Sequence, residues 1–499
     1  MATRVMPSIV ADSATAFANP PRKDRVVNQK RPNIVFIMTD DHAAHAMSCY
    51  GSRINTTPHM DRIAEAGVRL DNCFCTNSIC TPSRATILAG THNHVNNVTT
   101  LSTPMDNRLQ TFPKLLRESG YQTALFGKWH LGQGPEHCPT GFDDWAVLPG
   151  QGLYHNPEFI FKAPEGGEKR TVKGYVSDLI TDMCLDWLQQ RDEDRPFCLL
   201  CHHKAPHREW EPDEKHAHMY LNEDIPEPET LYDDYTHRAA AAKAAEMRVG
   251  PHMTWRDLKC NPNQTLPENE LRKWAYQRYI KDYLRVIASV DDNIGRLLDY
   301  LNDQGLAEDT IVIYTSDQGF FLGDHGWYDK RFMYEESLRM PFVLRYPREV
   351  PACSDNQDMI LNLDFASTLL DYAGVGVPEE FQGRSFRDNL RGETPPDWRQ
   401  SMYYRYWMHK AHHNVYAHYG IRTHRYKLIY YYGDALGQPG AIDETHEPEW
   451  ELFDLEKDPH ELHSVYNDPA YATVVRELTD ELHRLQTECG DQRYHKDLA

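Results

Sequence analysis

The sequence is short of positive charge. Its 499 residues include 53 Lys and Arg against 74 Asp and Glu, which gives a formal net charge of −21 at pH 7. A protein that binds nucleic acid needs an extended basic surface, because Lys and Arg neutralise the bound phosphates. The excess of acid therefore argues against a nucleic-acid partner. Any anionic ligand would have to be bound by a small, local group of cations.

Long apolar runs are also absent. No segment approaches the roughly 20 consecutive apolar residues of a membrane span, so we expect a soluble protein that does not act in a membrane. Residues 1–31 lack the apolar run of a secretory signal and are expected to form a flexible arm. This favours a cytoplasmic location, and a periplasmic or secreted one stays open if a signal was removed.

A disulfide framework is missing as well. The eleven cysteines are an odd number and are scattered from Cys49 to Cys489 without a framework spacing. This usage favours reduced, mostly buried thiols. Cys73, Cys75 and Cys80 do not have the spacing of a standard zinc site.

Four short apolar runs end in polar or charged residues, which is typical of buried strands. They are residues 33–41, 122–128, 197–202 and 310–317. Helical patterns lie between them, most clearly in residues 279–301, where apolar side chains recur at three and four residues. This alternation predicts an α/β protein with a mostly parallel sheet flanked by helices. In such sheets ligands bind beyond the carboxyl ends of the strands.

The residue pattern of the sequence changes after about residue 374. We expect one α/β domain over residues 32–374 and a smaller α+β domain over residues 375–499. The second domain contains a tyrosine-rich, β-rich stretch over residues 403–432 and a closing helix from about residue 469 to 485. An antiparallel sheet with one helix is the structure predicted for it.

The segment Cys80–Gly90 has a Cys-X-Pro-X-Arg core followed by a helix of small residues. It resembles the signature of the type I sulfatases, and the resemblance extends from Pro32 to about Leu485. It implies an alkaline-phosphatase-like fold with its catalytic domain over residues 32–374. It also implies that a maturation enzyme oxidises Cys80 to formylglycine. In the family, one hydroxyl of the hydrated aldehyde attacks sulfur and the other later loses its proton and expels sulfate.

The resemblance also implies a metal site. Asp40, Asp41, Asp317 and Gln318 match the family's metal ligands, with the modified residue 80 as another. Carboxylate and amide oxygens suit a hard cation, Ca²⁺ or Mg²⁺, better than zinc.

Five cations complete the catalytic set that the resemblance implies. Arg84 lies one helical turn after the cysteine and can reach back to the diol and the carboxylates. Lys128 and His130 belong to a segment that resembles the second sulfatase signature, and His130 is the expected base for the diol proton. His207 and Lys330 match positions that contact the sulfate and the leaving-group oxygen.

The substrate is expected to be a carbohydrate sulfate. Residues 91–97 and 329–335 look like the corresponding stretches of N-acetylglucosamine-6-sulfatases and related bacterial carbohydrate sulfatases. His94, His418 and Arg422 are candidates for contacts with the sugar. An aryl sulfatase, a phosphonate monoester or phosphodiester hydrolase, and a binding protein that has lost the chemistry remain as alternatives. The sequence leaves the oligomeric state open.

Overall fold

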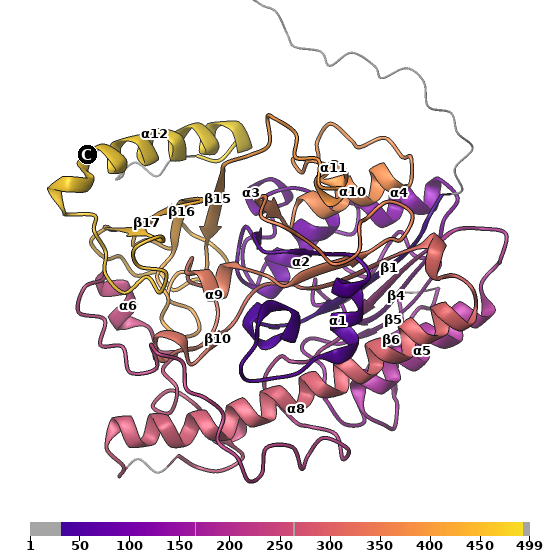
Figure 1. Cartoon of the computed structure of the whole chain (residues 1–499), viewed down its shortest axis with the longest axis horizontal. Helices are drawn as coiled ribbons and strands as arrows, with labels where there is room; N and C mark the ends of the chain where they lie inside the picture. Colours follow the sequence, from indigo (N-terminus) through magenta and orange to yellow (C-terminus); the bar gives the residue numbers. More distant parts are fainter. Residues whose placement is uncertain (1–30, 165, 263–264, 493–499) are drawn as a thin grey trace, which may run out of the picture. The chain divides into compact units, whose positions relative to one another are not determined.

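The computed structural model of the chain describes residues 31–492, except residues 165 and 263–264. The arm predicted for residues 1–31 therefore lies outside the described residues, apart from Arg31. Strands and helices alternate along most of the chain (Figure 1). The helices are α1 (Pro58–Glu65), α2 (Cys80–Ala89), α3 (Asn93–Asn96), α4 (Phe112–Glu118), α5 (Val176–Gln190), α6 (Ala240–Ala244), α7 (Trp255–Leu258), α8 (Glu268–Asp303), α9 (Glu335–Leu338), α10 (Asp364–Tyr372), α11 (Arg387–Leu390) and α12 (Ala472–Cys489).

A ten-stranded sheet has the strand order β13-β2-β12-β9-β1-β8-β4-β5-β6-β7. Its middle strands, from β9 to β5, run parallel, and antiparallel pairs occur on both sides of them. Its strands are β1 (Asn33–Thr39), β2 (Val68–Leu70), β4 (Gln122–Lys128), β5 (Asp144–Leu148), β6 (Glu158–Phe161), β7 (Glu168–Thr171), β8 (Phe197–His202), β9 (Thr310–Ser316), β12 (Phe342–Arg345) and β13 (Ser354–Asn356). Two further pairs are short, β3 (Cys73–Phe74) with β14 (Ile360–Leu361) and β10 (Phe321–Leu322) with β11 (Tyr328–Asp329).

Helices cover both faces of this sheet. α1, α5 and α8 pack together on one face, and α2, α4 and α10 pack on the other (Figure 1). Strands β1, β8 and β9 are buried along their whole length, because neither face meets water. In α8 the apolar residues of the predicted pattern form the buried side of the helix, and they include Tyr283, Val290 and Leu297. The predicted mostly parallel α/β sheet is confirmed.

A second sheet is antiparallel throughout, with β15 (Ser401–Tyr406), β16 (His418–Thr423), β17 (Tyr426–Tyr431) and β18 (Glu449–Asp454) in chain order. α12 packs against it, and Leu478 and Leu482 join Tyr419 and Leu428 in a small apolar cluster. The predicted sheet with one helix is confirmed. The helix begins at Ala472, a few residues later than predicted, because residues 469–471 form a 3-10 turn. The domain spans 32–374 and 375–499 stay a prediction.

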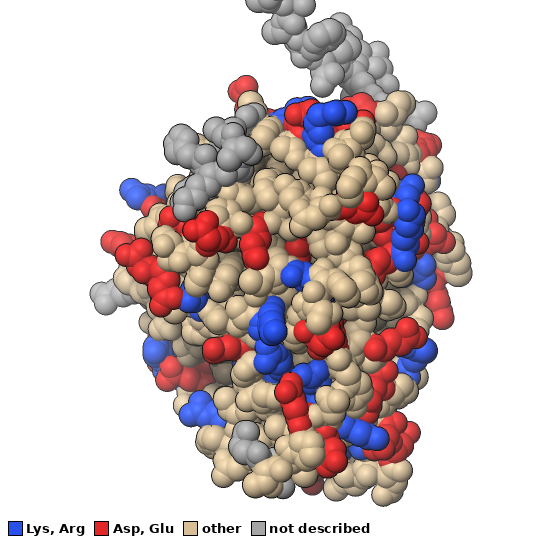
Figure 2. Space-filling model, turned by 90° about the vertical axis from the view of Figure 1, so that its left-hand side faces the viewer, with Lys and Arg blue, Asp and Glu red and all other residues tan. Residues whose placement is uncertain are grey.

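The surface and the thiols follow from the composition. Figure 2 shows Asp and Glu spread over one face, with a group of Lys and Arg near its middle and further Lys and Arg towards its edges. All eleven cysteines lie in the described residues and are unpaired, and six of them are buried. Between residues 31 and 492, as far as the structure describes them, no helix is both long and apolar enough to cross a membrane.

Candidate active site

Two neighbouring strands bring four polar side chains to one edge of the sheet. Asp40 and Asp41 follow β1, and Asp317 and Gln318 follow β9. The two strands are paired in parallel up to their last residues, so the four side chains begin side by side. All four residues are fully buried. This edge, at the carboxyl ends of β1 and β9, is where the sequence predicts the metal ligands.

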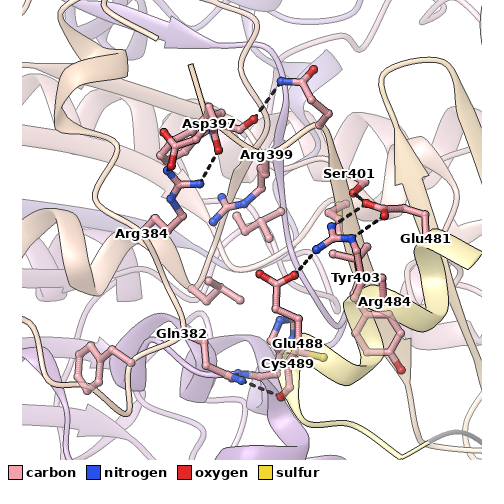
Figure 3. Close-up of a pocket in the computed structure, with 18 of the residues that line it drawn as sticks. Gln382, Arg384, Asp397, Arg399, Ser401, Tyr403, Glu481, Arg484, Glu488 and Cys489 are labelled. Atoms are coloured by element: carbon pink, nitrogen blue, oxygen red, sulfur yellow. Dashed lines mark hydrogen bonds and ion pairs between the residues drawn. The ribbon is translucent and has the colours of Figure 1, made fainter. Parts of the chain in front are cut away.

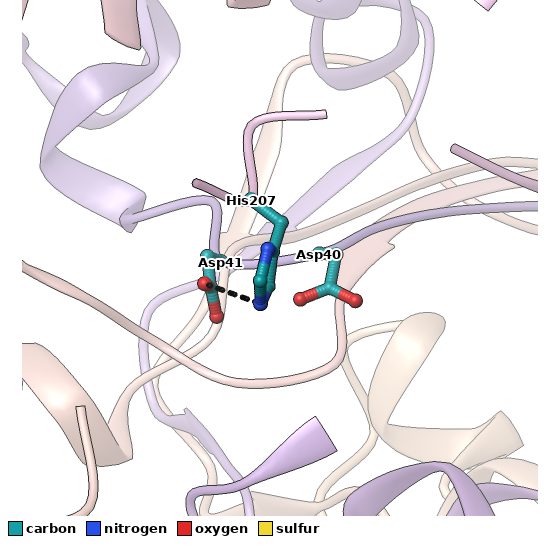
Figure 4. A group of neighbouring side chains, drawn as sticks. All are labelled: Asp40, Asp41 and His207. Carbon is teal, nitrogen blue, oxygen red and sulfur yellow. Dashed lines mark ion pairs between the residues drawn. The ribbon is translucent and has the colours of Figure 1, made fainter. Parts of the chain in front are cut away.

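Basic side chains that follow other strands face these carboxylates. Lys330 follows β11, and its Nζ atom donates to Oδ1 and Oδ2 of Asp41 at 2.6 and 2.8 Å. Lys128, the last residue of β4, forms an ion pair with Asp40. His207 follows β8, and its Nε2 atom lies 3.9 Å from Oδ2 of Asp41. Figure 4 shows the imidazole between the carboxylates of Asp40 and Asp41.

Helix α2 delivers the cysteine and the arginine. Cys80 is its first residue, and Arg84 lies one turn further along. The Arg84 guanidinium donates from Nε to Asp317 at 2.9 Å, from Nη2 to Asp40 at 3.1 Å and from Nη1 to the Lys128 carbonyl at 2.8 Å. One buried side chain thus joins the ends of β9, β1 and β4.

The residues present fit a divalent cation. Oδ1 of Asp40 and Oε1 of Gln318 are buried and have no hydrogen-bond partner. Buried oxygens without partners are unfavourable, and they are the ligand atoms that Ca²⁺ and Mg²⁺ prefer. Asp40, Asp41 and His207 offer ligand atoms within 4.8 Å of one another. Among the described residues, no other group of His, Cys, Asp and Glu side chains meets this criterion.

The charges of the carboxylates are uneven. Burial raises the pKa of Asp41 to about 6 and, with repulsion from Asp40, that of Asp317 to about 7. Burial also opposes ionisation of Asp40, but Lys128, His207 and Arg84 hold its pKa well below the usual value. Ionising all three carboxylates therefore requires more positive charge than the side chains supply.

The thiol and the imidazoles are uncharged. Burial raises the pKa of Cys80 to about 11, so at neutral pH the residue is a thiol and a weak nucleophile. Burial, followed by repulsion from Lys128, places the pKa values of His130 and His207 well below the ordinary histidine value. Both rings are therefore neutral, and each has one ring nitrogen without a proton.

His130 stands beside the start of α2. Its backbone has a φ of 55°, and its carbonyl accepts a hydrogen bond of 2.7 Å from the Thr81 hydroxyl.

Gly127, near the end of β4, allows this strand to lie close to the neighbouring strand β8. A Cβ atom there would lie 1.9 Å from the carbonyl oxygen of His202, and φ at this glycine is 109°.

Sequence reasoning missed several residues of this cluster. Gln151, which follows β5, accepts a hydrogen bond from Lys128 Nζ. Lys204 follows β8 and is buried, and burial lowers the pKa of its amine to about 7. Asp329 and Arg331 flank Lys330 and pair with each other at 3.2 Å. Each lies at or just beyond a strand end, Asp329 being the last residue of β11, so the rule that found the acids could have found them too.

The three residues proposed for sugar contacts are not brought into this cluster. Nε2 of His94 is 2.8 Å from the carbonyl oxygen of Cys489. His418 accepts a hydrogen bond from the Met333 amide at 3.1 Å, and Arg422 donates to Glu335 at 3.1 and 3.2 Å. Each of them contacts protein groups here, although Nη1 of Arg422 has no hydrogen-bond partner, and their role in substrate binding stays a prediction.

A large cavity lies elsewhere. It has a volume of about 630 Å³ and is lined by α12 and by residues between Glu379 and Tyr403. Figure 3 shows two of its arginines in ion pairs, Arg384 with Asp397 at 2.9 Å and Arg484 with Glu481 and Glu488, and Arg399 pairs with Asp364. None of the predicted site residues lines it. The cavity therefore adds nothing to the predicted chemistry.

Known proteins resemble nearly the whole chain. Residues 32–375 match the family described as Sulfatase, and residues 323–488 match N-sulphoglucosamine sulphohydrolase, C-terminal. An N-acetylglucosamine-6-O-sulfatase from Bacteroides thetaiotaomicron is 42% identical, over 97% of this chain and 90% of its own. The structure of BT4656 in complex with its substrate D-glucosamine-2-N,6-O-disulfate matches with a TM-score of 0.86 at 42% identity, covering 92% of this chain and 98% of that one. A phosphonate monoester hydrolase from Silicibacter pomeroyi shares the fold, with a TM-score of 0.72 at 20% identity over 93% of this chain and 98% of its own.

These matches agree with the fold and with the cluster at the strand ends. The fold is alkaline-phosphatase-like, as the signature implied. The phosphonate hydrolase is similar in fold alone, and the alternatives of a phosphorus-ester hydrolase or an inactive binding protein are not favoured. Membership also implies a formylglycine modification and a metal ion. The chain belongs to the sulfatase family and is a sulfuric ester hydrolase.

Proposed function

We propose that this sulfatase removes a sulfate ester from a sugar, and that a 6-O-sulfated glucosamine-type residue is its favoured substrate. The observation that carries the proposal is the convergence of Cys80, a set of buried carboxylates and a set of cations at one sheet edge. The sugar is supported by the relative named as an N-acetylglucosamine-6-O-sulfatase and by the structure bound to a glucosamine disulfate.

The metal site of this proposal consists of Asp40, Asp41, Asp317 and Gln318, with residue 80 as a further ligand. The orphaned oxygens of Asp40 and Gln318 support it, and the oxygen-rich set favours Ca²⁺, with Mg²⁺ as the second choice. When bound, the cation supplies positive charge against the oxygens of the sulfate. The raised pKa values of Asp41 and Asp317 support a site completed by a cation.

Residue 80 supplies the nucleophile after oxidation of the cysteine by a maturation enzyme, which we propose as a partner. The modification provides a hydrated aldehyde, with one hydroxyl for attack on sulfur and one whose proton is later removed. Arg84 and Lys128 orient the carboxylates around this position through their buried contacts. Cys80 itself, a buried thiol with a pKa raised to about 11, is a poor nucleophile, which supports the need for conversion.

The neutral imidazole of His130 accepts the proton of the second hydroxyl. His207 and Lys330 face the sulfate and the leaving-group oxygen. Their shared contact with Asp41 supports a joint role at this point of the cluster. The ammonium of Lys330 supplies positive charge there, and His207 supplies a ring nitrogen.

A substrate panel tests the proposal. The enzyme and its Cys80→Ala variant are assayed on N-acetylglucosamine 6-sulfate, 4-nitrophenyl sulfate, a phosphodiester and a phosphonate monoester. We expect the highest kcat/KM on the sugar sulfate, and no turnover by Cys80→Ala, whose fold should remain. A preference for 4-nitrophenyl sulfate would make an aryl sulfate, not a sugar sulfate, the favoured substrate. Turnover of the phosphorus esters far above that of both sulfates would overturn the proposal.

A further inference from the structure

Lys204 is a buried amine beside the cluster that none of the roles above uses. It lies two residues beyond β8 and is 3% exposed. The charges of Lys128, Asp40 and Asp41 all act on it. Burial of an amine is unfavourable unless specific contacts offset the loss of water. Its contacts therefore indicate what this lysine does.

Those contacts converge on the backbone around His207. Nζ of Lys204 donates to the carbonyl oxygen of Arg208 at 3.2 Å and lies 4.5 Å from the centre of the Tyr154 ring. The Tyr154 hydroxyl donates to the carbonyl of His207 at 2.6 Å, and the His207 amide donates to the carbonyl of Lys204 at 3.0 Å. Lys204 and Tyr154 thus each donate to a carbonyl of this turn, and both are almost fully buried.

The Arg208 carbonyl has a second partner, which is the imidazole itself. Nδ1 of His207 makes a short hydrogen bond to the same oxygen that accepts from Lys204. A carbonyl oxygen only accepts, so Nδ1 carries the proton and Nε2 is left as the ring atom facing Asp41. The tautomer and direction of the ring therefore depend on where this carbonyl stands.

We propose that Lys204, together with Tyr154, is a positioning residue for sulfate-ester hydrolysis. It fixes the Arg208 carbonyl, which holds the proton of His207 on Nδ1 and directs Nε2 into the cluster. A group that orients a catalytic imidazole from behind commonly matters nearly as much as the direct contacts. The inference rests on the proposed role of His207 at the leaving-group oxygen.

The first test compares two leaving groups. In Lys204→Met the chain length is kept and the ammonium is lost. We expect kcat on N-acetylglucosamine 6-sulfate, whose alcohol leaves poorly, to fall about 10- to 100-fold, with KM little changed. The fall on 4-nitrophenyl sulfate should be much smaller, because its phenolate leaves without a proton, whereas the sugar alcohol needs one from the Lys330 ammonium, which shares Asp41 with His207. Lys204→Arg should restore part of the loss, since a guanidinium can also donate to the carbonyl.

The second test is a double-mutant cycle with His207→Ala. If Lys204 acts through His207, adding Lys204→Met to His207→Ala changes kcat by no more than about twofold. An equal fall on both leaving groups, or a full Lys204→Met loss in the His207→Ala background, would overturn the inference. Failure of the wild-type enzyme on every sugar sulfate would instead overturn the proposed function.

Two further variants keep the test interpretable. Tyr154→Phe removes the hydroxyl that holds the His207 carbonyl, so it should show the same leaving-group dependence if Lys204→Met does not fold. Lys114→Met is the matched control. Like Lys204, Lys114 donates to backbone carbonyls, in its case two of them at 2.6 and 2.7 Å, but it lies outside the cluster. It should leave kcat unchanged on both substrates.

Discussion

At the scale of single residues, the site is organised by buried charge. Arg84 is 2% exposed and makes three hydrogen bonds that join three strand ends, so it is structural and functional at once. Removing one partner of a buried ion pair leaves the other uncompensated. The carboxylates of Asp40 and Asp317 would be the groups left behind.

Arg84→Ala should therefore lower both stability and metal affinity. We expect a loss of about 3–5 kcal/mol in the free energy of unfolding, measured by urea denaturation, and loss of sulfate release. The control is Arg108→Ala, which removes an exposed pair with Asp106 and should change neither. Unchanged stability of Arg84→Ala would contradict the account of the buried network.

The raised pKa values of Asp41 and Asp317, about 6 and 7, make the metal-free protein sensitive to pH. A carboxyl whose pKa is higher in the folded chain stabilises the fold below its unfolded pKa, and that stability is lost as pH rises through the folded pKa. The lowered pKa of Asp40 acts in the opposite direction, but only at pH values below about 4.

The Tm of the EDTA-treated protein should therefore fall between about pH 4 and about pH 8, and added Ca²⁺ should raise the Tm most at the upper end. Asp317→Asn removes one titrating group, so its metal-free Tm should fall less than that of the wild type. A wild-type Tm that falls no more steeply than that of Asp317→Asn would show that these carboxyls do not carry the effect.

At the scale of elements, the close approach of β4 to β8 places Lys128 and His130. Gly127→Ala forces a Cβ atom against the His202 carbonyl and should push the strands apart. Gly120→Ala is matched in backbone strain, since φ there is 100°, but the new Cβ would meet only the Arg31 side chain at 3.6 Å.

We expect Gly120→Ala to cost about 1–2 kcal/mol and to leave kcat unchanged. Gly127→Ala should cost about 1–3 kcal/mol more and lower kcat, as measured by denaturation and by initial rates. Equal effects of the two variants would contradict the importance of the close approach.

The elements also show what sequence can predict. The apolar runs that end near Asp40, Lys128 and Asp317 predict three strands. Because these strands are parallel, their carboxyl ends lie at the same edge of the sheet, and the cluster there could be predicted from the sequence. The contact of Arg84 with the Lys128 carbonyl depends on tertiary packing, which no local pattern encodes. The left-handed backbone of His130 could not be predicted either, because the residue is not a glycine, which is the usual sequence signal for this conformation.

The substrate candidates show the same limit. His418 and Arg422 lie on one side of β16, as the strand period requires, but their partners Met333 and Glu335 are far away in the sequence. Polar side chains on a strand could therefore be recognised, whereas the groups they bind could not.

At the scale of the whole molecule, a chain with a net charge of −21 gathers a few of its cations at one edge of the sheet. Figure 2 shows acidic side chains over the face around a central group of Lys and Arg. Sheet topology collects the cations Lys128 and Lys330, together with the neutral imidazole of His207, around buried carboxylates. An acidic protein can in this way offer positive charge to an anion at one site without a basic surface.

The most direct test of the account is the mass of the peptide that contains Cys80, taken from catalytically active protein. Conversion of the thiol to the aldehyde predicts a mass about 18 Da below that of the unmodified peptide. A fully active preparation in which this peptide carries only the unmodified thiol would contradict the central claim.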